Sequence, residues 1–248
     1  MSSRNKSQIE LQKLGVIPSA PNLANTVLGA VPSSSEVYNL DCVALMKKYP
    51  DKWFDLAVVD VPYGIGESLN DNKSRSKLSK SKAYTKKDWD LSAPEKVYFE
   101  ELKRVSKNQI VWGANHFISK LPYDSSCWIV WDKQNGSNDF ADCELAWTSF
   151  NTAVRKFEFR WHGMLQGNMK DKEFRIHPTQ KPVALYDWIF KMYATEGMKI
   201  LDTHLGSGSS RISANKNKLN FVGCEIDKEY YDSQNKRYDE FVSQLRMW

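Results

Sequence analysis

Four consecutive residues, Asp60-Val61-Pro62-Tyr63, follow directly after the apolar run at residues 54–59. The run predicts a buried strand, and the carboxylate and the proline predict that it stops in a tight polar turn. In open α/β sheets the carboxyl ends of the strands form the edge where ligands bind. A carboxylate and a turn carbonyl can accept the two hydrogens of an exocyclic amine there, while an aromatic ring stacks on the heterocycle. These residue types therefore indicate a site for a flat heterocyclic amine.

A glycine-rich loop near the carboxyl end of the chain could hold a cofactor. Residues 198–201 predict a short strand that Asp202 ends, and Gly206 and Gly208 lie in a turn that leads into a predicted helix from about Ser209. Glycines are needed in such a turn because a ligand must approach the backbone closely and because the turn can require positive φ. The loop thus predicts a ligand site beside a second strand end.

An acidic residue follows this loop at a distance typical of nucleoside-binding sites. Residues 220–224 predict the next strand, which ends in Glu225. A carboxylate about 20 positions after such a loop can hold the two hydroxyls of a ribose. The loop lacks the third glycine of the dinucleotide fingerprint and the Gly-Lys-Ser/Thr ending of a phosphate-binding loop. These absences argue against NAD and ATP as the cofactor.

The elements that must position these residues can be read from the remaining pattern. Residues 177–182 read His-Pro-Thr-Gln-Lys-Pro and precede an amphipathic segment at residues 183–195, which predicts a helix between Pro182 and Gly197. Asp41 suits the cap of a short helix. Further strands are predicted at residues 37–40, 109–113, 127–131 and 143–147, and further helices at residues 42–49 and 94–107.

The order of these motifs resembles that of the β-type DNA amino-methyltransferases. Residues 60–63 are similar to the Asp-Pro-Pro-Tyr signature of that family, and the segment from residue 177 to residue 227 looks like its carboxyl half. In this circularly permuted group the catalytic motif precedes the S-adenosylmethionine motif. The resemblance covers most of residues 36–245. It implies a Rossmann-like α/β methyltransferase fold, with a mixed, mostly parallel sheet and helices on both faces.

The resemblance also implies a role for each matching residue. The catalytic residues would be Asp60, Val61, Pro62 and Tyr63, with the Asp60 carboxylate and the Val61 carbonyl accepting the target amine and Tyr63 stacking on the base. The cofactor would be S-adenosylmethionine. Its methionine end would lie on Thr179, Gln180 and Lys181, with the lysine at its carboxylate, its middle on Asp202, Gly206 and Gly208, its ribose on Glu225 and its adenine amine on Asp41.

Three residues depart from the family pattern. Val61 stands where the family has its first proline, but the chemistry needs only a backbone carbonyl, and Pro62 restrains the backbone before it whatever the side chain. Thr203 and His204 stand where the family usually has Pro and Phe. We interpret His204 as filling an aromatic packing position beside the cofactor and assign it no chemistry.

Two segments are candidates for contact with nucleic acid. The first is a basic loop at residues 66–90. A run of charged residues is usually a solvated surface segment, but this one adjoins the predicted catalytic motif, which favours contact with phosphates. The second is a short target-recognition region at residues 154–176. The cationic residues singled out are Lys73, Arg75, Lys77, Lys80, Lys82, Lys86, Lys87, Arg155, Arg160 and Arg175.

Length and composition fit one domain. The 248 residues, 41% of them hydrophobic, are enough for one α/β core at residues 36–248, while residues 1–35 form an extension without a readable signal. No apolar run is long enough to span a membrane, and no secretory signal is visible. The four cysteines are far apart and in no metal-ligand spacing, so reduced thiols, no metal and a cytoplasmic location are expected. The resemblance implies that the cell is bacterial or phage-infected.

The resemblance therefore implies a site-specific DNA methyltransferase that acts on the exocyclic amine of adenine, in a restriction-modification setting. Its partner would be double-stranded DNA with the target base flipped out of the stack. Asp rather than Ser at the first position of the catalytic motif favours adenine within the family. Cytosine-N4 methylation, RNA amine methylation and a non-catalytic DNA-binding role stay open, as does a homodimer.

Overall fold

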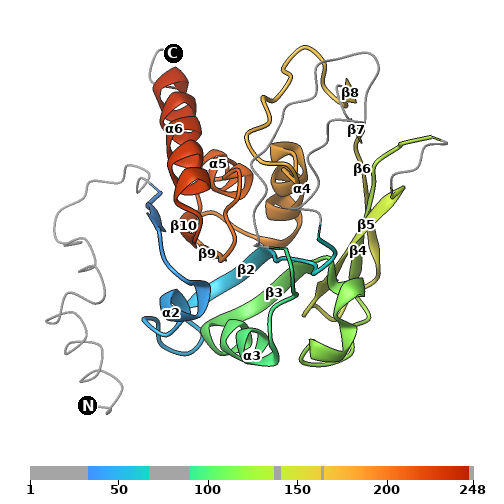
Figure 1. Ribbon diagram of the computed structural model, residues 1–248, viewed down its shortest axis with the longest axis vertical. Coiled ribbons are helices and arrows are strands. Elements are labelled where there is room, and N and C mark those ends of the chain that lie inside the picture. The colour runs from blue at the N-terminus through green and yellow to red at the C-terminus, as the bar shows by residue number, and fades with distance from the viewer. Residues whose placement is uncertain (1–32, 67–89, 137–140, 163–164, 246–248) are drawn as a thin grey trace, which may run out of the picture.

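A computed structural model describes residues 33–66, 90–136, 141–162 and 165–245. Its centre is an eight-stranded sheet with the order β1-β10-β9-β2-β3-β5-β4-β6 (Figure 1). The five strands from β1 to β3 are parallel, β5 is antiparallel to both β3 and β4, and β6 is parallel to β4. The bounds are β1 Ser35–Tyr38, β2 Phe54–Asp60, β3 Ser106–Trp112, β4 Trp128–Asp132, β5 Cys143–Thr148, β6 Arg155–Glu158, β9 Lys199–Asp202 and β10 Asn220–Cys224.

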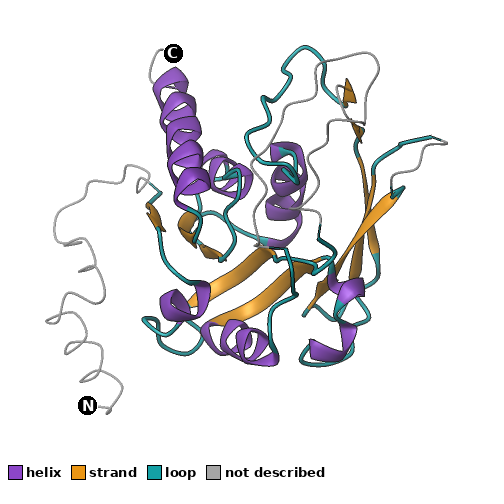
Figure 2. Cartoon of the chain, viewed as in Figure 1, coloured by secondary structure: helices purple, strands orange, loops and turns teal. Residues whose placement is uncertain are grey.

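Helices cover both faces of the sheet, as Figures 1 and 2 show. Successive residues of β2 point to opposite faces, so the strand contributes to two cores. Ala57 and Val59 pack beneath α2 and α3, and Leu56 and Val58 pack beneath α4 and α5. The bounds are α2 Cys42–Met46, α3 Lys96–Val105, α4 Val183–Tyr193, α5 Ser209–Lys216 and α6 Lys228–Leu245, with α6 beside α5. The predicted α/β class with a mixed, mostly parallel sheet is confirmed.

The strand that ends in Asp60 and the strand that leads into the glycine loop are neighbours at the centre of the sheet. Leu56 of β2 pairs with Ile200 of β9, and Ala57 pairs with Leu201. From this pair the chain moves outward in both directions, from β9 to β10 on one side and from β2 to β3 on the other. Such a switch point opens a ligand crevice at the carboxyl ends of the strands. The arrangement places Asp60 and Asp202 at that edge on adjacent strands.

The segment predicted as the target-recognition region, residues 154–176, contains a strand of the sheet. Its strand β6 pairs with β4 as an additional edge strand, and the recognition role of the segment stays a prediction. The sequence of β6, Arg-Lys-Phe-Glu, is mostly charged and exposed, and only Phe157 is half-buried. Charged residues are common on edge strands because they oppose further pairing. A two-stranded ribbon of β7 (Trp161–His162) and β8 (Leu165–Gln166) follows β6. Elsewhere in the chain, two short 3-10 helices, η2 (Ala114–His116) and η3 (Ile118–Lys120), follow β3.

Several predictions fall on residues that the structure does not describe. They are most of the extension at residues 1–35, residues 67–89 of the basic loop, and the seven cationic side chains Lys73, Arg75, Lys77, Lys80, Lys82, Lys86 and Lys87. Within the described ranges, no helix has the length and apolarity needed to cross a membrane. The same ranges hold no group of three or more His, Cys, Asp or Glu side chains that could bind a metal ion.

Candidate active site

Asp60 ends β2 with its carboxylate in a cluster of polar groups from distant parts of the chain. Its Oδ1 accepts from Nζ of Lys181 at 2.7 Å and from the hydroxyl of Tyr63 at 2.9 Å. The side chain of Lys181 is only 4% exposed, and that of Asp60 is 17% exposed. Lys181 lies directly before α4, which brings it over the carboxyl end of β2. The structure therefore joins two motifs that are 121 positions apart in the sequence.

A second carboxylate, Glu144 on β5, shares Lys181 with Asp60. Its Oε2 lies 2.9 Å from Nζ of Lys181, and its Oε1 pairs with Lys133, which follows β4. The Tyr63 hydroxyl also lies 3.3 Å from Oε2 of Glu144. The cluster thus contains two carboxylates and two ammonium groups, and it is neutral as a whole.

Burial and charge act on these groups in opposite directions. Burial raises the pKa of Asp60, and the nearby Lys181 limits the rise. Burial would also raise the pKa of Glu144, but the ammonium groups of Lys181 and Lys133 outweigh it and hold that pKa at about 2. Lys181 is desolvated as well, yet the two carboxylates raise its pKa. The lysine is therefore charged at neutral pH, and Glu144 is ionised.

The turn after Asp60 is held by a residue that comes much later in the sequence. Oδ1 of Asp90, which is 2% exposed, accepts from the backbone N–H of Tyr63 at 2.8 Å and of Gly64 at 2.9 Å. The Asp90 carbonyl accepts from Gly66 N–H at 3.1 Å. Val61, buried at 2% exposure, packs in the core beneath α2 and α3. The side chain that departs from the family pattern therefore serves the core.

The ring of Tyr63 lies against the chain that follows β3. It is stacked on His116, with the ring centroids 5.1 Å apart and the planes at 17°. A Cβ atom at Gly113 would lie 2.0 Å from the Tyr63 ring, so only glycine leaves room for it. Gly113 also has φ of +70°, which glycine adopts without strain. The predicted stacking of Tyr63 on a target base stays a prediction.

The glycine loop lies beside this cluster, at the ends of β9 and β10. Asp202 accepts from the backbone N–H of His204 at 3.0 Å and from the hydroxyl of Ser210 at 2.5 Å. Glu225 accepts from the backbone N–H of Gly206 at 2.9 Å, so it fixes the loop from the next strand. Gly206 and Gly208 have φ of +48° and +70°, and Gly208 is the residue that precedes α5. The positive φ predicted for this turn is confirmed, and close approach of a ligand to the loop stays a prediction.

The carboxylates around the loop are acidic groups without a basic partner within the described ranges. Burial raises the pKa of Asp202 to about 7 and also raises that of Glu225. Asp41, which follows β1, is exposed and caps α2 by accepting from the N–H of Ala44 at 2.9 Å. Because β9, β10 and β1 are consecutive strands, the three acidic residues line one edge of the sheet.

Thr203 and His204, the two departures in this motif, bond to each other. The Thr203 hydroxyl lies 2.9 Å from Nδ1 of His204 and 2.6 Å from the hydroxyl of Tyr98 on α3. The His204 ring packs edge-on against Tyr98, with the centroids 5.4 Å apart. Burial lowers the pKa of His204 to about 4, so the imidazole is neutral at pH 7. These contacts agree with the aromatic packing role predicted for His204.

Thr179 and Gln180 are held by neighbouring residues. The Thr179 hydroxyl lies 3.1 Å from Nδ1 of His177. Gln180, which is 4% exposed, accepts at its side-chain oxygen from the N–H of Ile176 at 3.0 Å and at its carbonyl from the indole N–H of Trp161 at 2.7 Å. Contact of these residues with a cofactor stays a prediction.

Comparison with protein families gives the decisive observation. Residues 79–236 match the sequence profile of the N6/N4 methyltransferases, described as DNA methylase, which is more than half of the chain. The chain belongs to this DNA methylase family.

Two curated relatives agree with this assignment. The type II methyltransferase M2.MboI of Moraxella bovis is 22% identical over 249 residues, which cover 85% of this chain and 89% of the relative. The type II methyltransferase M.HpaI of Haemophilus parainfluenzae is 35% identical over 69 residues, which cover 28% of this chain and 22% of the relative.

Solved structures of DNA methyltransferases share the fold. PvuII DNA methyltransferase, a cytosine-N4-specific enzyme, has a TM-score of 0.54 at 11% identity and covers 85% of this chain and 92% of its own. A proposed DNA modification methylase from Thermus thermophilus, solved with S-adenosyl-L-methionine, has a TM-score of 0.51 at 14% identity and covers 84% and 94%. The predicted Rossmann-like methyltransferase fold is confirmed.

The cationic residues of the predicted recognition region do not converge on Asp60. Register places Arg155 at the level of Asp60 but four strands away, through β3, β5 and β4, or roughly 19 Å at ordinary strand spacing. Arg160 is exposed beyond the end of β6. The guanidinium carbon of Arg175 lies 4.5 Å from the ring centroid of Trp161. Contact of these side chains with DNA stays a prediction.

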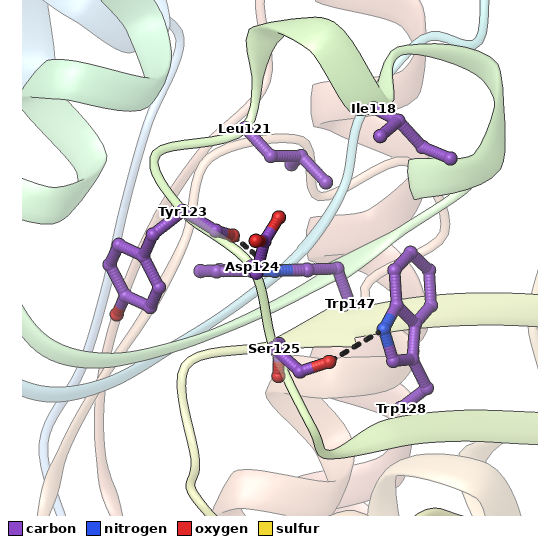
Figure 3. A pocket seen from close by; sticks show the side chains of 7 residues that line it. All are labelled: Ile118, Leu121, Tyr123, Asp124, Ser125, Trp128 and Trp147. Carbon is purple, nitrogen blue, oxygen red and sulfur yellow. Dashed lines mark hydrogen bonds between the residues drawn. The ribbon is translucent and has the colours of Figure 1, made fainter.

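The cavity drawn in Figure 3 lies on the opposite face of the sheet. It has a volume of about 360 Å³, and the indoles of Trp128 and Trp147 donate to the carbonyls of Ser125 and Tyr123 beside it. Trp147 belongs to the core beneath α2 and α3. Asp60 lies two residues after Val58 on β2 and therefore shares its face, which is the face covered by α4. The remaining lining residues are Ile118, Leu121 and Asp124. The cavity is separate from the proposed chemistry.

Sequence reasoning missed Glu144, Lys133, Asp90 and His116. A signal existed for Glu144, because it is a lone carboxylate within the otherwise apolar strand Cys143–Thr148, and a buried carboxylate requires a cationic or hydrogen-bonding partner. No comparable local signal marks Asp90, which follows a segment rich in charged residues.

Proposed function

We propose that the protein transfers a methyl group from S-adenosylmethionine to the exocyclic N6 amine of adenine in DNA. The observation that carries the proposal is the position of Asp60. Its carboxylate stands at the sheet edge where ligands bind, next to the Val61 carbonyl and one strand from the acidic glycine loop. The Lys181 and Tyr63 donors both bind Oδ1, so the described residues leave the lone pairs of Oδ2 for an amine.

The residues around the glycine loop fit this cofactor. Asp41, Asp202 and Glu225 form an edge that favours hydroxyl, amine and cationic groups and repels phosphates. Glu225 would bind the ribose hydroxyls and Asp41 the adenine amine, and positive φ at Gly206 and Gly208 shapes the loop around the ligand. When bound, the cofactor supplies an electrophilic methyl group on a positively charged sulfur.

The chain's own residues would act mainly by positioning. The lone pair of the adenine amine is delocalised into the ring, so the nitrogen is a poor nucleophile. Hydrogen bonds from the amine to the Asp60 carboxylate and the Val61 carbonyl favour a more tetrahedral nitrogen and direct its lone pair at the methyl carbon. The base must be flipped out of the duplex to reach this site, and Tyr63 offers an aromatic surface for it.

Surface charge and the relatives set the context of the proposal. Exposed Arg155 and Arg160, together with Arg175 and the cationic residues of the basic loop, would contact DNA phosphates. Because the relatives carry type II names, a restriction-modification setting in the bacterial cytoplasm is part of the proposal.

The test is to incubate the protein with methyl-labelled S-adenosylmethionine and duplex DNA, digest the DNA to nucleosides and identify the labelled nucleoside. We expect N6-methyladenosine as its deoxynucleoside, and we expect no label with the Asp60→Ala variant. Label in N4-methylcytosine would show that the enzyme methylates the exocyclic amine of cytosine instead of adenine. Label only in RNA would change the substrate class. Cofactor binding without transfer to DNA or RNA would indicate a non-catalytic protein.

A further inference from the structure

Lys181 is the common partner of three acceptors in the candidate active site. An ammonium group has three hydrogens, and three acceptors lie around Nζ of Lys181: Asp60 at 2.7 Å, Glu144 at 2.9 Å and the Tyr63 hydroxyl at 3.0 Å. The rings of Tyr63 and Trp112 lie with their centroids 5.5 Å from the same nitrogen. The contact with a cofactor carboxylate that the sequence suggests would require one of these bonds to be exchanged.

We propose that Glu144 is a positioning residue, which shares Lys181 with Asp60 and thereby controls how much of the lysine's charge the catalytic carboxylate receives; this inference rests on the proposed function. Glu144 does not need to touch the substrate in this role. It holds the ammonium group from β5, on the side away from β2, and Lys133 balances its charge.

The geometry supports one ammonium group, that of Lys181, shared between Asp60 and Glu144, rather than a separate ion pair between Lys181 and either carboxylate. Lys181 is 4% exposed, so its ammonium group has little water to replace a lost carboxylate. If Glu144 were absent, the lysine's charge would be directed at Asp60 alone. If Lys181 were absent, two carboxylates at the same site would repel each other, and the less stabilised one would take up a proton more readily.

The charged and titratable groups around Asp60 come from the turn after β2 and from four other elements, α4, β4, β5 and β9. Lys181, Tyr63 and Glu144 contact it or its partners directly. Lys133 acts on Glu144 from the end of β4. Tyr186 of α4 and Asp202 of β9 interact with the Asp60 charge at longer range. Of these, Lys181 lowers the pKa of Asp60 and Glu144 raises it, so removing them should have opposite effects.

The experiment compares Lys181→Met with Glu144→Gln. Single-turnover methyl transfer is measured against pH with saturating cofactor and duplex DNA, and the carboxyl carbon of Asp60 is titrated by NMR in protein labelled with ¹³C at aspartate, with Asp60→Asn for assignment. We expect the acid limb of the pH–rate profile and the midpoint of the Asp60 NMR titration to move together. Both should rise by about one pH unit in Lys181→Met and fall by a similar amount in Glu144→Gln. Lys181→Arg keeps the charge and should keep the limb.

Asp55→Asn is the matched control. Asp55 forms an ion pair with Lys107 at the other end of β2, about 16 Å from Asp60 at ordinary strand rise. Its loss should leave the acid limb unchanged, and each variant is checked for folding by circular dichroism.

Two results would overturn the inference. An Asp60 midpoint in Glu144→Gln equal to that of the wild type would show that Glu144 serves stability alone, and a movement in the same direction as in Lys181→Met would contradict the sharing of one cation. The NMR titration does not require turnover. An inactive wild type would therefore refute the proposed function, while the carboxyl titration would still decide the role of Glu144.

Discussion

Asp60 and Asp202 end neighbouring strands of one sheet, but their carboxylates meet different donors. Asp60 and its neighbour Glu144 share the ammonium group of Lys181, and Lys133 completes the charge balance. Asp202 and Glu225 accept from backbone N–H groups and a serine hydroxyl, with no basic side chain bound to them within the described ranges. Basic side chains therefore balance the carboxylates on the Asp60 side, whereas within the described ranges none balances Asp202 and Glu225.

This difference suggests how the two ligands of the proposed reaction are separated. A neutral target base needs oriented acceptors, and bonds to Lys181 and Tyr63 fix the orientation of the Asp60 carboxylate. A cofactor that carries a sulfonium and an ammonium group benefits from unbalanced carboxylates nearby. The two sides should therefore respond differently to loss of a single carboxylate charge.

The largest effect is expected on the Asp60 side. Asp60→Asn keeps the size of the side chain, but its amide can present a donor where the target amine needs an acceptor, so methyl transfer should fall by about 10³-fold. The cofactor dissociation constant should change by less than about threefold, because the proposed function places Asp60 at the target base and not at the cofactor. Single-turnover kinetics and calorimetric titration with S-adenosylmethionine measure the two quantities. A comparable loss of cofactor affinity would erase the distinction between the sides.

The reverse pattern is expected for Glu225→Gln. Loss of the charge-assisted bond to Gly206, and of the bond that we propose to the ribose, should weaken cofactor binding by about 10- to 30-fold. The rate at saturating cofactor should stay within a few-fold of the wild type. Calorimetry and a saturation series measure both. A large loss of rate at full saturation would show that the acidic side also takes part in the chemical step.

Asp202→Asn should make the protein more stable at alkaline pH. The pKa of Asp202 is raised to about 7, so the folded state binds this proton more tightly than the unfolded state does, and wild-type stability falls as pH rises toward 7. An uncharged amide avoids this cost, and the variant should gain on the order of 2 kcal/mol at pH 8 and little at pH 4. Urea unfolding at the two pH values tests this. Equal effects at both would contradict ionisation as the cause.

The smallest effect is expected at Asp90, a carboxylate on the catalytic side that accepts backbone N–H groups as Glu225 does. Asp90→Asn keeps the acceptor oxygen for Tyr63 and Gly64 but loses its charge, so methyl transfer should fall by about fivefold, or about 1 kcal/mol. Asp90→Ala loses both bonds and should cost more. Rates of the two variants under identical conditions measure the difference, and equal losses would show that the charge alone matters.

The sequence was most informative where a local pattern decides the structure. The predicted strand at residues 220–224 coincides with β10, and the helix predicted from about Ser209 begins there as α5. The apolar run before Asp60 folds as the central strand β2 because it is buried on both faces. The strand ends, and with them Asp60, Asp202 and Glu225, follow from these elements.

The contacts of Lys181 could not be predicted in the same way. Its partners Asp60 and Glu144 come from strands that are joined only through the sheet order β2-β3-β5, in which β5 is antiparallel and precedes α4 by a long connection. Pairing across such distances depends on register, which no local pattern supplies. The charged edge strand β6 was missed for a related reason, because its composition is typical of a solvated segment.

The bond between Gly66 N–H and the carbonyl of Asp90 has a consequence for the evolution of the chain. Together with the bonds that Asp90 accepts from the N–H groups of Tyr63 and Gly64, it holds Gly66 and Asp90 at a fixed separation beside the turn after Asp60, where the connection at residues 67–89 begins and ends. The entropy of closing a connection grows only with the logarithm of its length, by about 0.6 kcal/mol for each doubling. Insertions and deletions between these anchors should therefore be tolerated, and this stretch can diverge among related proteins without disturbing Asp60.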